Sequence, residues 1–128
     1  PIMPAACRAG NALRRGLVGL SSKIKVAFIY GSIAEGKEKS ESDIDVMVIA
    51  EGLTYSQLFE VLTKAEETLG RKVSPTLYSP EDFLKKVQGD NHFVTRVLNQ
   101  PKIDLLGHEN DIQPGKTPEP GKDRLAQV

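Results

Sequence analysis

Two aspartates, Asp43 and Asp45, stand at the start of an apolar run that extends to Ala50. Because the side chains of a strand alternate between its two faces, both aspartates are expected to project from the same face. Two carboxylates this close repel each other unless a cation lies between them. Mg²⁺ prefers such hard oxygen ligands and binds through one or two carboxylates together with substrate phosphates. The pair therefore predicts a magnesium site.

A glycine–serine turn, Gly31-Ser32, follows a second apolar run from Ile24 to Tyr30. Backbone N–H groups at such a turn, with the serine hydroxyl, can bind a phosphate. Ser32 to Glu35 is expected to begin a short helix, whose N-terminus favours anions. The turn and the aspartates together predict a metal–triphosphate site. The complete upstream motif disfavours the alternative that the aspartates are only turn and strand-end residues.

The arrangement of a Gly-Ser turn, a later Gly36, and Ser42 leading into Asp43-Ile44-Asp45 resembles the nucleotidyltransferase superfamily of polymerase β. More narrowly, it resembles the small minimal nucleotidyltransferase domains, over roughly residues 20 to 106. The resemblance implies transfer of a nucleoside monophosphate from an NTP to a hydroxyl group on a protein or a small molecule. Members of this kind are often paired with a HEPN-type toxin, which makes such a toxin or another protein acceptor the implied partner.

The resemblance also implies a role for individual residues. Asp43 and Asp45 would be the catalytic residues and the Mg²⁺ ligands. The nucleotide would be bound by four residues of the same segment: Gly31, Ser32, Gly36 and Ser42.

Two positions depart from the family pattern. A third carboxylate is expected on the next strand, where this chain has Ser74, and a neutral hydroxyl cannot hold a metal by charge or act as a general base. Asp104 has a similar local setting but is expected on a later strand, which makes it a poor substitute. Glu35 stands where the family usually has arginine, and an acid near a phosphate site should weaken nucleotide binding unless its side chain points away.

These departures leave two classes of function open. In the first, the chain is an active nucleotidyltransferase. In the second, it is a degenerate member that binds a nucleotide or a partner and regulates without turnover. A third interpretation, part of a DNA-binding regulator, requires a helix-turn-helix ahead of the domain. Residues 1–22 are too few for one, so this interpretation applies if the chain was cut from a longer protein.

The order of the expected helices and strands predicts an α/β (α+β) fold, a mixed sheet of about four strands with helices mainly on one face. The resemblance implies that this is the polymerase β-like nucleotidyltransferase fold. Expected strands cover 23–30, 44–50, 71–78 and 102–106, with a helix over 54–69. The stretch 5–20 is expected to form an amphipathic helix, and helices are expected to begin after Ser79 and near Asn91. The expected organisation is an N-terminal helical segment (1–22), the nucleotidyltransferase-like domain (23–107) and a disordered tail (108–128).

Composition narrows the setting of the protein. The chain has 128 residues, enough for one domain, and its 17 basic residues balance 17 acidic ones. Charge therefore does not favour binding to long nucleic acids. The single Cys7 excludes an internal disulfide and fits a reducing cytoplasmic location. No apolar run is long enough to span a membrane, and the first residues lack the features of a signal peptide.

Overall fold

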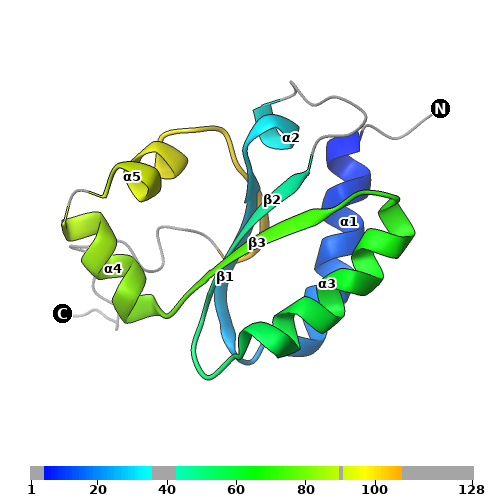
Figure 1. Cartoon of the computed structure of the whole chain (residues 1–128), viewed down its shortest axis with the longest axis horizontal. Helices are drawn as coiled ribbons and strands as arrows, with labels where there is room; N and C mark the ends of the chain where they lie inside the picture. The colour runs from blue at the N-terminus through cyan, green and yellow to red at the C-terminus, as the bar shows by residue number, and fades with distance from the viewer. Residues whose placement is uncertain (1–4, 36–42, 90, 108–128) are drawn as a thin grey trace, which may run out of the picture.

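The computed structural model describes residues 5–35, 43–89 and 91–107 (Figure 1). The chain forms, in order, α1 (Ala5–Leu17), a 3₁₀ turn (Val18–Leu20), β1 (Ile24–Tyr30), α2 (Ser32–Glu35), β2 (Ile44–Ala50), α3 (Tyr55–Leu69), β3 (Val73–Tyr78), α4 (Pro80–Gln88), α5 (His92–Leu98) and β4 (Ile103–Leu106). Each helix and strand expected from the sequence is present within a few residues of its expected bounds. The expected tail, 108–128, lies outside the described residues.

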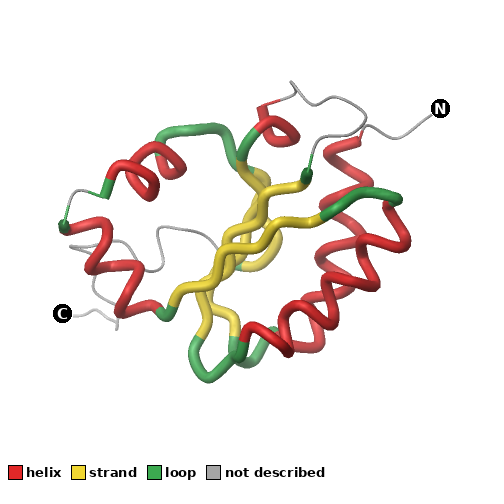
Figure 2. The backbone as a smooth tube through the Cα atoms, in the orientation of Figure 1, coloured by secondary structure: helices red, strands yellow, loops and turns green. Residues whose placement is uncertain are grey.

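The sheet has four strands in the order β3-β2-β1-β4. β2 and β3 are parallel, whereas β1 is antiparallel to both β2 and β4, so the sheet is mixed as expected. The two longest helices, α1 and α3, cover one face, and the shorter α4 and α5 cover the other (Figures 1 and 2). The prediction of helices mainly on one face therefore describes α1 and α3, while the second face has a smaller helical layer of its own.

β1 is buried on both faces, as its apolar sequence predicts. Alternation along the sequence of β1 predicts that Ile24 shares a face with Val26, Phe28 and Tyr30, and this prediction is wrong. The register with β2 shifts between Ile24 and Val26, and Ile24 packs instead in the core under α1 and α3. An extra residue at such an irregularity reverses the alternation of side chains on one side of it.

The helices begin and end where the sequence provides caps. Thr54 and Gln57 form a reciprocal capping box at the start of α3, and Gly70 ends that helix with φ of 67°. Ser79 caps α4 by accepting a hydrogen bond from the Asp82 N–H, with Pro80 as the first helical residue. None of the helices in the described ranges is long and apolar enough to cross a membrane.

β3 is an edge strand, as the proline within it suggests. The Ile44 N–H donates to the Lys72 carbonyl, so the backbone groups of Val73 and Pro75 face away from β2. A Glu66 carboxylate oxygen accepts a hydrogen bond from the Val73 N–H at 2.7 Å, and Pro75 has no N–H. The hydrogen bond to Glu66 and the proline each remove an N–H donor that could otherwise pair with another strand.

Replacing Glu66 with alanine should destabilise the fold by about 1–3 kcal/mol, because the Val73 N–H loses a charged acceptor. Thermal unfolding measures this change. Glu67→Ala is the matched control, since its exposed side chain is one residue further along α3. Equal destabilisation by both substitutions would show that the Glu66 hydrogen bond contributes nothing specific.

Candidate active site

The end of β1 and the start of β2 lie side by side. Tyr30, the last residue of β1, is opposite Asp45, and the Gly31-Ser32 turn follows it directly. Asp45 is on the same face as Met47, which is buried under α4 and α5. Asp43 stands two residues before Asp45 and is exposed. The antiparallel pairing thus brings the predicted aspartates and the predicted phosphate-binding turn to one end of the sheet.

Gly31 has a positive φ of 81° and lies against the Asp45 carboxylate. A Cβ atom at this position would lie well inside 3.0 Å of the Asp45 Oδ2 atom, closer than real Cβ atoms approach. Only glycine therefore allows both the turn and the carboxylate to occupy this space. The contact also shows that the Asp45 carboxylate is next to the turn from which α2 starts at Ser32.

Three of the predicted site residues, and Glu35, are described only in part or not at all. Ser32 and Glu35 lie in α2, but their side chains are not among the described features. Gly36 and Ser42 lie outside the described residues. The role of the acid at position 35 therefore stays a prediction.

The aspartate pair is electrostatically strained. Burial raises the pKa of Asp45 above its ordinary value, and the negative charge of Asp43 raises it further. A cation between the two carboxylates would offset both the desolvation and the repulsion. Oxygen donors in this state suit a hard divalent ion. Within the described ranges, no group of three or more His, Cys, Asp or Glu side chains gathers, so no third described side chain of these types joins Asp43 and Asp45.

Ser74 lies directly opposite Asp45 on the neighbouring strand β3. It occupies the position where the sequence comparison placed the missing acid. Asp104 lies opposite Phe28 on β4, so β1 separates it from Asp45. The sheet order thus keeps Asp104 at least two strand spacings, about 10 Å, from the aspartate strand, in agreement with its expected place on a later strand.

Tyr30 and Thr76 are site residues that sequence reasoning missed. Their hydroxyl oxygens are 3.4 Å apart, on the same face as Asp45. Burial raises the pKa of Tyr30, and the charge of Asp45 adds to this effect against the opposing hydrogen bond from Thr76. One signal in the sequence could have identified Tyr30: it is the last residue of the strand that leads into Gly31, and is therefore close to the predicted site.

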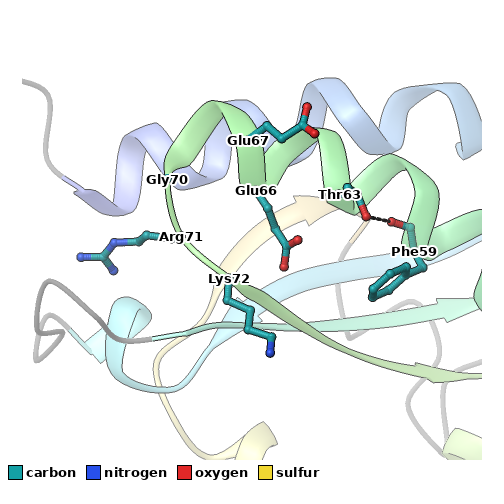
Figure 3. A pocket seen from close by; sticks show the side chains of 7 residues that line it. All are labelled: Phe59, Thr63, Glu66, Glu67, Gly70, Arg71 and Lys72. Atoms are coloured by element: carbon teal, nitrogen blue, oxygen red, sulfur yellow. Dashed lines mark hydrogen bonds between the residues drawn. The ribbon is translucent and has the colours of Figure 1, made fainter.

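A separate hollow in the described surface lies away from the aspartates. It has a volume of about 420 Å³ and is lined by Phe59, Thr63, Glu66, Glu67, Gly70, Arg71 and Lys72 (Figure 3). These residues belong to α3 and to the connection into β3, whereas Asp45 and Ser74 face α4 and α5. The hollow is therefore distinct from the aspartate site.

The sequence profile of the polymerase β nucleotidyltransferase family matches residues 18–103. The chain belongs to this family. Membership of this family accounts for the fold. A relative from Methanocaldococcus jannaschii, provisionally named a protein adenylyltransferase, is 33% identical over 99 residues, which cover 75% of this chain and 97% of the relative.

Solved nucleotidyltransferase structures have the same fold. One is a toxin–antitoxin structure with a TM-score of 0.56 and 17% identity, matched over 80% of this chain and 76% of the other. Another contains an MNT antitoxin in complex with a tri-AMPylated HEPN toxin of Shewanella oneidensis, with a TM-score of 0.50 and 17% identity, over 83% and 76% of the two chains. At this identity the likeness concerns the fold.

Proposed function

We propose that this domain transfers AMP from ATP to a hydroxyl group of a protein, with Mg²⁺ as cofactor. The observation that carries the proposal is the juxtaposition of the Asp43–Asp45 pair with the Gly31-Ser32 turn at one end of the sheet. Three relatives from Methanocaldococcus jannaschii are provisionally named protein adenylyltransferases. Their names favour AMP as the transferred group and a protein as the acceptor.

Asp43 and Asp45 would hold the metal. Bound there, Mg²⁺ would supply positive charge to neutralise the phosphates of the nucleotide and of the departing pyrophosphate. The backbone of the Gly31-Ser32 turn would bind the triphosphate, since a turn at a helix start presents N–H groups to an anion. The Asp45 carboxylate lies against this turn and would therefore orient a nucleotide bound there.

The proposed acceptor is a cytoplasmic partner protein of the HEPN toxin type. Support comes from the structural neighbours, which were solved as toxin–antitoxin complexes, one of them with an AMPylated toxin. The even balance of acidic and basic residues argues against a nucleic acid as the acceptor.

Incubation of the protein with ATP labelled at the α-phosphate, Mg²⁺ and a co-expressed toxin partner tests this function. Label is expected on the partner in the presence of Mg²⁺ and not with EDTA. The Asp43→Asn/Asp45→Asn double variant should transfer none. Transfer that persists in the double variant would contradict the assignment of the site.

A second candidate function, nucleotide binding and regulation without turnover, is favoured by Ser74. A neutral hydroxyl stands opposite Asp45 where a third carboxylate would complete the acidic set. Ser74→Asp is then expected to raise the rate of AMP transfer at least tenfold, because it adds a metal-binding charge beside Asp45. Ser74→Asn is the control, because asparagine has the same size as aspartate but carries no charge.

The two candidates differ in the wild-type rate. If wild-type protein already transfers AMP and Ser74→Asp does not increase the rate, the serine is compatible with catalysis and the regulatory function is wrong. If only the Ser74→Asp variant transfers AMP, the wild-type domain is a nucleotide-binding regulator without turnover.

A further inference from the structure

The side chain of Tyr30 spans the sheet behind Asp45. Tyr30 is on β1 and Thr76 is on β3, with β2 between them, yet their hydroxyl oxygens are 3.4 Å apart. Thr76 is opposite Met47, one step along the face from Asp45. The phenol ring must therefore cross β2 next to the Asp45 side chain, on the side away from the end of the sheet.

The ring is fixed from several directions. Only 8% of Tyr30 is exposed. The rings of Phe28 on β1 and Phe93 on α5 contact it edge-on, with centroid distances of 6.3 and 6.0 Å. Such edge-to-face pairs favour one orientation of the ring. The hydroxyl contact with Thr76 is long for two hydroxyl groups, so packing fixes the ring more than the hydrogen bond does.

We propose that the ring of Tyr30 is a wall that keeps the Asp45 carboxylate pointed at the Gly31-Ser32 turn. The path of the ring from β1 to Thr76 puts it on the Met47 side of Asp45. On the other side, the carboxylate has room because Gly31 lacks a Cβ atom. These two neighbours favour a carboxylate that points toward the turn and the predicted phosphates. Tyr30 is a positioning residue in this account, which rests on the proposed function for its use in nucleotide binding.

The ring of Tyr30 also contacts α5, through Phe93. Phe93 is partly exposed and stacks edge-on against Tyr30. Phe93 thus connects the short helical layer on the second face of the sheet to the ring that lies beside the proposed metal site.

Tyr30→Leu tests the proposal, with Tyr30→Phe as the conservative variant that keeps the ring. Tyr78→Leu is the matched control. Tyr78 is on β3, on the same face of the sheet as Tyr30, and its ring packs on Phe83. None of the described interactions joins Tyr78 to the aspartates. Two quantities are measured on the full chain. The first is the side-chain carboxyl ¹³C resonance of Asp45 without metal, assigned from its loss in Asp45→Asn, and the second is the affinity for ATP with Mg²⁺.

Tyr30→Leu is expected to shift the Asp45 resonance and to weaken ATP binding at least tenfold, about 1.4 kcal/mol. Tyr30→Phe should stay within about threefold of wild type, the loss expected of one weak hydrogen bond. Tyr78→Leu should change neither quantity. The proposal is overturned if Tyr30→Leu behaves like Tyr78→Leu, or if Tyr30→Phe loses as much as Tyr30→Leu. Absence of ATP binding in wild type would contradict the proposed function alone, because the carboxyl resonance still tests the wall.

Discussion

Gly31→Ala is expected to destabilise the fold and to abolish ATP binding. The backbone there has φ of 81°, which costs a residue with a Cβ atom about 1–2 kcal/mol. The new methyl group would also overlap Oδ2 of Asp45, so the carboxylate must leave its position beside the turn. Thermal unfolding measures the first effect and calorimetric titration with ATP and Mg²⁺ the second.

Gly52→Ala separates the two causes. Gly52 has a similar φ of 70°, but a Cβ atom there would meet nothing within 4 Å. Its substitution should therefore show the backbone strain alone and leave ATP binding unchanged. Adding Asp45→Ala to Gly31→Ala should remove the part of the destabilisation that exceeds that of Gly52→Ala. If Gly31→Ala and Gly52→Ala are equally stable and bind ATP equally, the close contact with Asp45 has no consequence.

Asp45→Asn is expected to change stability and binding in opposite directions. The amide has the same shape as the carboxylate but carries no charge to desolvate and none to be repelled by Asp43. Without metal, this variant should therefore melt at a higher temperature than wild type at pH 7. It should also lose Mg²⁺-dependent ATP binding. Such opposed effects are typical of residues kept for function at a cost in stability.

The pH dependence follows from the direction of the pKa shift. The folded state holds the Asp45 proton more tightly than the unfolded state does, because burial and Asp43 raise the pKa of Asp45. Stability contributed by this proton is fully present below the unfolded-state pKa, about 3.9, and is lost as pH rises through the higher folded-state value. The stability difference between Asp45→Asn and wild type should thus be small at low pH and constant above the raised pKa.

Asp104→Asn is the control for both effects. Asp104 is an exposed aspartate on the same sheet, separated from Asp45 by β1. This variant should bind ATP as wild type does, which would also exclude Asp104 as a replacement for the third acid. A wild type that is more stable than Asp45→Asn at pH 7 without metal would contradict the account of a strained carboxylate pair.

Most of the fold could be predicted from sequence because its elements have strong local signals. Thr54, Gly70 and Ser79 mark helix ends by their own chemistry, and the apolar run of β2 indicates an internal strand. The face of Ile24 was not predictable in this way. It depends on a register shift between β1 and β2, which is decided by pairing with a distant strand and leaves no mark within β1.

The site was predictable where neighbours in sequence are also neighbours in space. Asp45 lies in β2 and Asp43 directly precedes that strand, so alternation along the chain is enough to predict that they share a face. Tyr30 and Thr76 are 46 positions apart, and their contact requires the order of three strands to be known. The close approach of Gly31 to Asp45 likewise needs the antiparallel register.

For Ser74, the position could be predicted from sequence, but the effect on turnover could not. The sequence pattern predicted that it replaces an acid on the next strand, and the parallel register puts it directly opposite Asp45. Whether a hydroxyl there permits turnover depends on charge and metal binding, which the pattern of strands does not determine. The comparison of Ser74→Asp with wild type addresses this point.

Isothermal titration calorimetry of ATP, with and without Mg²⁺, tests the central claim most directly. The account predicts binding that requires Mg²⁺ in wild type and disappears in Asp43→Asn/Asp45→Asn, while Asp104→Asn binds as wild type does. Absence of ATP binding in wild type, or Mg²⁺-dependent binding that survives in the double variant, would contradict a metal–nucleotide site at Asp43 and Asp45.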